Sequence, residues 1–138
     1  MTLTERKCNL FTVNKAYTLA HCISSDYSLG AGIAVEFKKR YHLSEKLKEV
    51  GTGACPACIY VNGVFNLVTK KKYWGKPTYE NLKKSLEMMK SFAIKYEINA
   101  IAMPKIGCGL DRLQWPKVRE IISEVFQDTD CEILVCSL

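Results

Sequence analysis

Residues 17–40, YTLAHCISSDYSLGAGIAVEFKKR, place a strand, a loop and a helix in direct succession. Residues 17–23 form an apolar run that predicts a buried strand, whereas residues 24–32 are polar and contain glycine, as expected of a loop. Residues 33–40 predict a helix that begins where this loop ends. A strand followed by a loop and a helix is typical of an α/β domain, in which ligands bind at the carboxyl ends of the strands.

Short-range signals further along the chain predict a hairpin and a long helix. Asn62-Gly63 is the type of pair that most readily supplies the two positive φ angles of a type I′ turn, so residues 59–61 and 64–69 predict a β-hairpin. Thr78 predicts the cap of an amphipathic helix. The apolar residues of that helix recur at three-and-four spacing and are Leu82, Leu86, Met89, Ala93 and Tyr96.

The remaining segments continue the alternation of strands and helices. Residues 98–103 and 132–136 predict buried strands, and residues 115–126 predict a helix with Pro116 in its first turn. This alternation predicts an α/β fold whose mixed central sheet is covered by helices on both faces, with the hairpin as its antiparallel part.

The composition is that of one globular domain. The chain has 138 residues, 48% of them hydrophobic and 25% charged, and we expect residues 1–138 to form a single domain. No apolar run has the length of a signal peptide or a membrane span, so we expect a soluble, intracellular protein that does not bind membranes. The net charge of +6 favours an anionic partner.

The seven cysteines are odd in number and mostly lie in apolar runs, which predicts reduced thiols in the core. Cys55 and Cys58 have CxxC spacing, but no second pair accompanies them and they lead into a strand rather than a helix. This context argues against a redox or zinc site. The chain has only two histidines, so no metal site is expected.

Two glycine-containing loops that follow strands are the candidate ligand-binding segments. Residues 30–34, GAGIA, allow close backbone approach and run into a helix whose first N–H groups favour phosphate. Residues 104–111, PKIGCGLD, place two glycines around a small residue and end in a carboxylate. Two such loops facing one crevice could grip a diphosphate, although glycines after strands are often only tight turns. Neither loop matches a P-loop or a GxGxxG fingerprint.

Several runs of residues, taken in order, carry a resemblance to a known family. They are LAHCIS at 19–24, GAGIAV at 30–35, TKK at 69–71, KPTYENL at 76–82, MP at 103–104 and IGCGLDRLQW at 106–115. With these runs the sequence resembles macrodomains over nearly its whole length, specifically the terminal ADP-ribose protein glycohydrolase type, also called O-acetyl-ADP-ribose deacetylase. The resemblance implies a three-layer α/β/α macrodomain fold, ADP-ribose lying across the crest of the sheet, and no cofactor or metal.

The resemblance also implies which residues form the site. The catalytic lysine of the family falls on Lys70 and its catalytic aspartate on Asp111. Lys70 would attack the anomeric carbon of the distal ribose and displace a protein carboxylate, and Asp111 would act as acid or base to resolve the lysine adduct. The implied ADP-ribose-binding residues are Asn9, Leu10, His21, Ser24, Gly30, Ala31, Gly32, Ile33, Ala34, Pro104, Lys105, Ile106, Gly107, Cys108, Gly109, Leu110 and Leu138.

Taken without the resemblance, some of these side chains have simpler interpretations. Lys70 reads as an exposed lysine at a strand end, Asp111 as a helix cap or a partner of Arg112, and His21 as a hydrogen-bonded core residue. Asn9 departs from the family pattern, which commonly has an aspartate before Leu-Phe to recognise the adenine amino group. The Asn9 side-chain oxygen still accepts a hydrogen bond but is uncharged, so we expect weaker discrimination of adenine.

We therefore expect a monomeric hydrolase of ADP-ribosyl esters on proteins and of O-acetyl-ADP-ribose, located in the cytoplasm or, in a eukaryote, also in the nucleus. Its expected partners are ADP-ribose and ADP-ribosylated proteins. One alternative is a non-catalytic ADP-ribose reader, which needs the two loops but not Lys70 and Asp111 together. Another is a hydrolase of ADP-ribosylated nucleic acid, for which Tyr73 and Trp74 among the neighbouring lysines provide a short aromatic and basic strip, or simply a surface pair.

Overall fold

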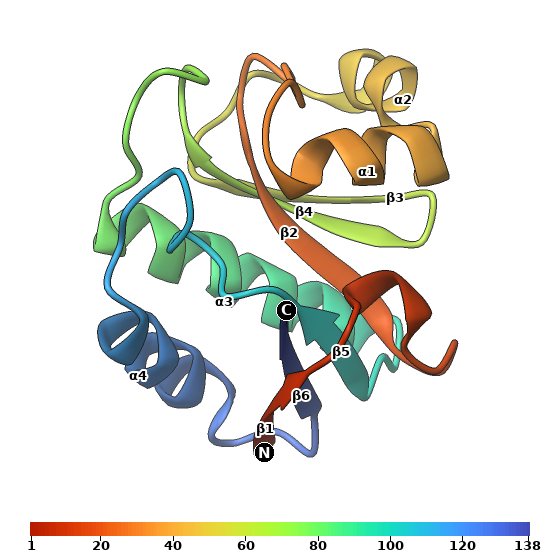
Figure 1. The fold of residues 1–138 in the computed structure, drawn as a ribbon, viewed down its shortest axis with the longest axis vertical. Helices are drawn as coiled ribbons and strands as arrows, with labels where there is room; N and C mark the ends of the chain where they lie inside the picture. The colour runs from red at the N-terminus through yellow and green to blue at the C-terminus, as the bar shows by residue number, and fades with distance from the viewer.

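The computed structural model describes residues 1–138 and shows one six-stranded sheet with helices packed against it (Figure 1). The strands are β1 (Thr2–Lys7), β2 (Thr18–Ser24), β3 (Ala57–Val61), β4 (Val64–Lys70), β5 (Ala100–Met103) and β6 (Glu132–Ser137). The helices are α1 (Ile33–Tyr41), α2 (Leu43–Val50), α3 (Tyr79–Lys95) and α4 (Trp115–Phe126), with a short 3-10 helix η1 (Leu10–Thr12) after β1.

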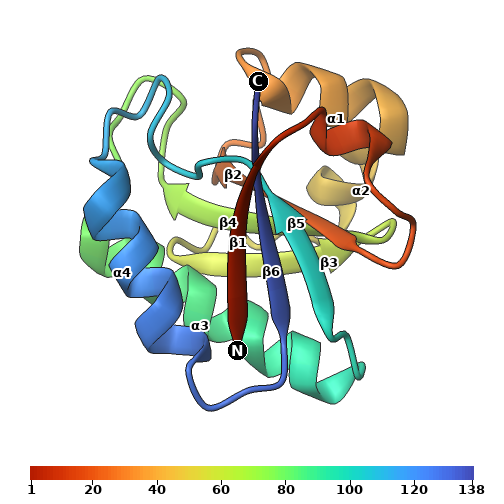
Figure 2. The same ribbon diagram turned by 60° about the horizontal axis from the view of Figure 1, so that its bottom comes forward.

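The sheet is mixed and has helices on both faces. Its strand order is β1-β6-β5-β2-β4-β3, and every neighbouring pair is parallel except β3 with β4. Helices α1 and α2 cover one face, and α3 and α4 cover the other (Figures 1 and 2). Each face has its own apolar cluster, with Phe37 and Leu47 on the first side and Leu86 and Phe126 on the second. The expected three-layer α/β/α fold with a mixed sheet is confirmed.

The turn and the helix cap that the sequence predicted are both present. Asn62 and Gly63 have φ angles of 51° and 75°, and they make the tight turn between β3 and β4. The Thr78 hydroxyl accepts a hydrogen bond from the Asn81 N–H at 3.0 Å, and α3 begins at the residue after this cap. Both devices depend only on neighbouring residues, which is why the sequence alone predicts them.

Other segments differ from the prediction. The strand expected at residues 98–103 begins at Ala100, because the Ile98 N–H donates to the Ala93 carbonyl at 2.8 Å and completes the end of α3. The sequence did not predict β1, an edge strand in which five of six residues are exposed and no apolar alternation marks it. Nor did it predict α2, whose only buried residues are Leu43 and Leu47.

β1 and β6 run parallel along the edge of the sheet, so the two ends of the chain lie at opposite ends of these strands (Figure 2). All seven cysteine thiols are free. Cys58, Cys131 and Cys136 are buried in the core, whereas the other four are only partly buried, so the expectation of core thiols holds for three of the seven. Burial raises the pKa of Cys58 to about 12, which disfavours the thiolate that redox or metal chemistry needs. None of the helices is both long and apolar enough to span a bilayer.

His21 lies at the centre of β2 and is completely buried. Its Nε2 lies 2.6 Å from the Asn66 Oδ1, and its ring stacks on Phe37 with the centroids 3.9 Å apart. The Asn66 amide donates to the carbonyls of Ile59 and Val64, so its oxygen is the acceptor for the histidine. The interpretation of His21 as a hydrogen-bonded core residue is confirmed. Burial lowers the pKa of His21 to about 4, with the Asn66 hydrogen bond acting in the opposite direction.

Because His21 is buried, we expect the free energy of unfolding to fall in mild acid. Its pKa is near 6.5 in the unfolded chain and about 4 in the folded one, so between these values only the unfolded chain is protonated. The free energy of unfolding should therefore fall by roughly 2 kcal/mol from this group as the pH drops from 7.5 to 5.0. Urea titrations at the two pH values measure the change.

The change from His21 to Gln removes this dependence, whatever it does to stability at neutral pH. His42→Asn is the matched control, because His42 is exposed and asparagine tolerates its positive φ of 52°. Equal pH dependence in wild type and His21→Gln would contradict the assignment.

Candidate functional site

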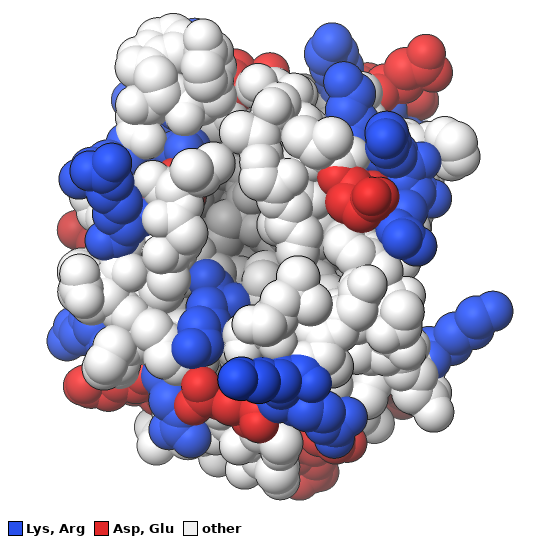
Figure 3. All heavy atoms as spheres, in the orientation of Figure 1, with Lys and Arg blue, Asp and Glu red and all other residues white.

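A cavity of about 680 Å³ opens at the carboxyl ends of β2, β4 and β5. Its walls come from the three loops that follow these strands, and the space-filling view shows the face hollowed between them (Figure 3). Because the three strands are parallel, their carboxyl ends share one edge of the sheet and their loops meet. The two candidate loops chosen from the sequence therefore face the same cavity, joined by a third.

The β2–α1 loop presents backbone rather than charged side chains. Gly32 precedes α1 with φ of 61° and ψ of −148°, a conformation that is essentially restricted to glycine. No side chain caps this end of the helix, and although the Val35 N–H donates to the Gly32 carbonyl, the N–H groups of Ile33 and Ala34 remain available at the cavity wall. Such N–H groups, together with the helix dipole, favour a bound phosphate.

The β5–α4 loop is a compact turn that glycine makes possible. Gly107 has a φ of 72°, and its carbonyl accepts a hydrogen bond from the Leu113 N–H at 2.7 Å. A Cβ atom at Gly107 would lie 2.8 Å from the Leu113 Cδ1, whereas a Cβ at Gly109 would meet nothing within 4 Å. The fold of this loop therefore sets the position of Asp111, two residues after Gly109.

Lys70 and Asp111, which are 41 residues apart in sequence, meet at the cavity wall. The Lys70 Nζ lies 2.6 Å from the Asp111 Oδ1, and the two side chains are only 14% and 16% exposed. The Lys70 Nζ also donates to the Tyr73 carbonyl at 3.0 Å. Asp111 is not the cap of α4, because that helix begins at Trp115 after Gln114.

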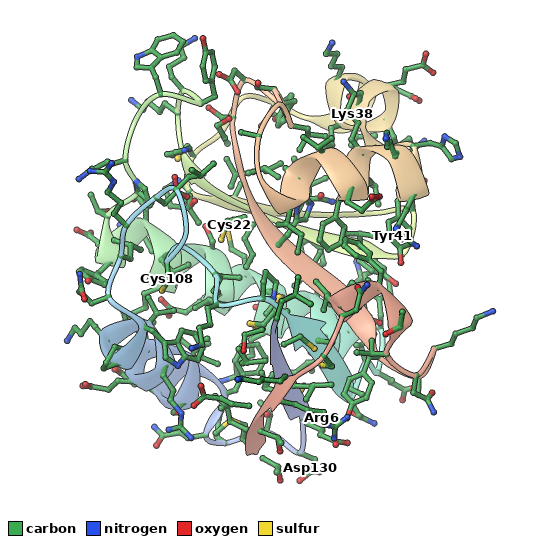
Figure 4. All side chains as sticks on the ribbon, viewed as in Figure 1. Arg6, Cys22, Lys38, Tyr41, Cys108 and Asp130 are labelled. Carbon is green, nitrogen blue, oxygen red and sulfur yellow. The ribbon has the colours of Figure 1, made fainter.

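Two cysteines near this pair are not competing nucleophiles. Cys22 lines the cavity, and burial, followed by the charge of Asp111, raises its pKa to about 12. Burial also raises the pKa of Cys108. Both thiols therefore stay protonated near neutral pH, and Figure 4 shows them on β2 and on the β5–α4 loop.

The structure gathers most of the residues predicted for the site into one cavity wall. Those that line it are Ser24, Gly30, Ala31, Gly32, Ile33, Ala34, Lys70, Pro104, Lys105, Ile106, Gly107, Gly109, Leu110 and Asp111. The Lys105 ammonium lies 5.8 Å from the centre of the Trp115 ring, so it is turned toward the neighbouring helix.

Five predicted residues do not line the cavity. His21 is held in the core by Asn66 and Phe37, so its buried position does not support the implied contact with ADP-ribose. The Asn9 side-chain oxygen is engaged by the Phe11 N–H at 2.9 Å and caps η1. The other three are Leu10, which is buried, Cys108, whose thiol donates to the Ile106 carbonyl, and Leu138, which is 98% exposed.

Other wall residues were not predicted for ADP-ribose binding. The β4–α3 loop contributes Tyr73, Trp74, Gly75 and Lys76, and the β5–α4 loop contributes Arg112. Residues 73–76 could have been found from their position. They follow β4, which is parallel to β2, so they lie at the edge of the sheet where ligands bind.

Comparison with known proteins identifies the fold and the family. A family model described as Macro domain matches residues 20–122. The chain belongs to the macrodomain family. Among its relatives, the ADP-ribose glycohydrolase OARD1 of Homo sapiens is 48% identical over 139 aligned positions, which cover 99% of this chain and 91% of that protein.

Solved structures agree with the macrodomain fold. The macrodomain of Mycobacterium tuberculosis DarG has a TM-score of 0.85 at 21% identity, with 99% of this chain and 98% of that chain covered. Thermosipho africanus DarTG, in complex with ADP-ribose, has a TM-score of 0.77 at 15% identity, with 98% of this chain and 41% of that chain covered. At these identities the likeness concerns the fold of the macrodomain alone.

The β5–α4 loop of this macrodomain provides a test of the site geometry. Gly107→Ala combines an unfavourable positive φ with a contact to Leu113, so we expect it to lower the free energy of unfolding by about 1–2 kcal/mol. Gly109→Ala in the same loop has open space around its Cβ and should change stability by less than about 0.5 kcal/mol. Urea unfolding of the three proteins measures both values, and equal stability of the two variants would contradict the loop geometry.

Proposed function

We propose that this macrodomain is an ADP-ribosyl glycohydrolase that removes ADP-ribose from glutamate and aspartate esters on proteins and from O-acetyl-ADP-ribose. The observation that carries the proposal is the contact of 2.6 Å between Lys70 and Asp111 in the wall of the cavity. The 48% identity to an ADP-ribose glycohydrolase over 99% of the chain supports it. A reader that only binds ADP-ribose has no need for this pair.

The cavity suits a molecule with a diphosphate between two sugars. Its volume of about 680 Å³ is in the range of small-molecule and cofactor sites. The glycine-rich loop and the start of α1 offer N–H groups to the diphosphate, while Lys70 at the end of β4 and Asp111 on the β5–α4 loop would face the distal ribose. This placement would put the anomeric carbon next to the salt bridge between Lys70 and Asp111.

The surroundings of Lys70 suit a nucleophilic amine. The Lys70 Nζ has two acceptors in place, the Tyr73 carbonyl at 3.0 Å and the Asp111 Oδ1 at 2.6 Å. Two of its N–H bonds are therefore fixed, and the third position on the nitrogen is left to face the substrate, where the nitrogen attacks once the ammonium has lost a proton to water. Orientation of this kind supplies a large part of many enzymatic rate enhancements.

The proposed reaction has two steps. In the first, a bond forms between the Lys70 Nζ and the anomeric carbon, the bond from this carbon to the ester oxygen breaks, and the carboxylate leaves with the electron pair. The amine nitrogen then releases a proton to Asp111, the acceptor already within hydrogen-bond distance. In the second step the protonated Asp111 returns this proton to the Lys70 Nζ and the bond from Nζ to the anomeric carbon breaks. The Asp111 carboxylate takes a proton from the water that attacks the same carbon, so ADP-ribose and free lysine are released, and Asp111 then gives its proton to the solvent. Acetate attached to the same carbon would leave in the same way.

Release of ADP-ribose from a glutamate-ADP-ribosylated protein tests this proposal. Wild type should release free ADP-ribose, whereas Lys70→Ala and Asp111→Ala should be slower by at least about 100-fold, because each removes a group of the reacting pair. Both variants should still bind ADP-ribose within about fivefold of wild type by calorimetry, since the diphosphate contacts remain. Lys71→Ala is the control, because this neighbouring lysine is exposed and does not line the cavity. Binding without release by wild type would indicate a reader instead.

A second candidate substrate, ADP-ribosylated single-stranded nucleic acid, is favoured by the rim of the cavity. Tyr73 and Trp74 are 61% and 70% exposed and lie edge to face with their centroids 4.9 Å apart. Lys71, Lys72 and Lys76 are exposed on the same loop. Exposed aromatic rings among lysines are the combination that binds single strands, through base stacking and phosphate contacts.

Affinity for single-stranded DNA distinguishes this candidate. If bases stack on the rim, Trp74→Ala should weaken binding by at least about fivefold, and the wild-type affinity should fall steeply with salt. Tyr96→Ala is the matched control, because Tyr96 is also exposed beside a lysine, Lys95, but lies at the end of α3 outside the cavity wall. If Trp74→Ala binds single-stranded DNA as tightly as wild type, the nucleic-acid candidate is contradicted and protein esters remain the proposed substrate.

A further inference from the structure

Asp26 joins the β2–α1 loop to the β4–α3 loop. Its Oδ1 accepts hydrogen bonds from the Ser24 hydroxyl and from the Ser28 N–H, the latter at 3.1 Å. Its Oδ2 accepts a hydrogen bond from the Tyr73 N–H at 2.9 Å. Both oxygens of this half-buried carboxylate are therefore engaged, one by its own loop and the other by the loop that follows Lys70.

Ser25 adds two more connections between the same loops. Its N–H donates to the Lys70 carbonyl at 2.9 Å, and its hydroxyl donates to the Lys71 carbonyl at 2.9 Å. The pairing of β2 with β4 also shifts at this point, so that Ser24 lies opposite Lys70 and Thr69 is the extra residue. Irregularities of this kind commonly change the direction of a side chain next to a site.

These contacts lead directly to the Lys70 amine. The Tyr73 N–H is held by Asp26, and the Tyr73 carbonyl holds the Lys70 Nζ at 3.0 Å. Residues 71–73 are exposed, and Ser25 holds the start of this turn through the Lys71 carbonyl. Asp26 is the side chain that holds the backbone of Tyr73 itself, next to the carbonyl that binds Lys70. Asp26 itself does not line the cavity and does not contact Lys70.

We propose that Asp26 is a positioning residue for Lys70, which it orients through the backbone of Tyr73 so that the amine lone pair is directed at the substrate. This inference rests on the proposed function of Lys70 as the nucleophile. Asp26 is suited to this task as a carboxylate. Burial raises its pKa, but the hydrogen bonds from Ser24, Tyr73 and Ser28 and the charge of Lys72 more than offset this, so the pKa lies below its usual value.

The change from Asp26 to Asn separates positioning from folding. An amide has one oxygen and one NH2 group, so either the Tyr73 N–H or the donors of Ser24 and Ser28 must lose their acceptor. We expect kcat for ester hydrolysis to fall by about 10- to 100-fold, while Kd for ADP-ribose and Tm stay close to wild type. Asp26→Glu retains both carboxylate oxygens and should have a kcat between those of wild type and Asp26→Asn.

Asp130→Asn is the matched control for the loss of one negative charge. Asp130 is exposed and lies at the end of the molecule away from the cavity, as Figure 4 shows. It should leave kcat and Kd unchanged. A kcat of Asp26→Asn equal to that of wild type, or an equal loss of kcat and ADP-ribose affinity together with a lower Tm, would overturn the proposal.

A second measurement does not depend on turnover. The ¹⁵N resonance of the Lys70 Nζ, assigned with Lys70→Ala, should shift in Asp26→Asn but not in Asp130→Asn. An unchanged resonance would overturn the positioning role even in an active enzyme. If Asp26→Asn shifts the resonance but wild type shows no hydrolysis, the proposed function is refuted instead. The link from Asp26 to Lys70 would then exist without the reaction.

Discussion

The parallel alignment of β2, β4 and β5 is the constraint on which the rest of the structure depends. Parallel strands end at the same edge of a sheet, so the segments that follow them meet although they begin at residues 25, 71 and 104 of the chain. The core on both faces of the sheet makes this alignment rigid. Lys70, at the end of β4, and Asp111, in the loop that follows β5, come within 2.6 Å of each other as a result.

The sequence predicts those parts of the fold that depend on neighbouring residues. The turn at Asn62 and Gly63 and the cap at Thr78 are examples, and both form as expected. β1 could not be predicted in this way, because its polar residues form a strand only when the edge of β6 is available to pair with them. The start of β5 is similar, since Ile98 is used to end α3 rather than to begin the strand.

The same distinction applies to the site, of which only the parts that depend on neighbouring residues could be predicted. Glycines after a strand predict loops that approach a ligand, and the two loops do line the cavity. The pairing of Lys70 with Asp111 was implied only by the resemblance to macrodomains, because nothing local relates two residues 41 positions apart. The aromatic rim at Tyr73 and Trp74 and the contacts of Asp26 depend on how the loops pack together, which no single stretch of sequence encodes. The Asn9 side-chain oxygen caps η1, and its contact with the adenine amino group stays a prediction.

The parallel pairing of β1 with β6 also bears on how this protein is attached to a surface or a fusion partner. Chain ends on parallel neighbours point to opposite ends of the sheet, so Met1 lies far from the edge with the cavity and Leu138 lies at that edge (Figure 2). A support linked through Met1 therefore leaves the cavity mouth facing the bulk solution. A bulky partner fused after Leu138 would instead stand beside the mouth and restrict the approach of large modified proteins more than that of small nucleotides.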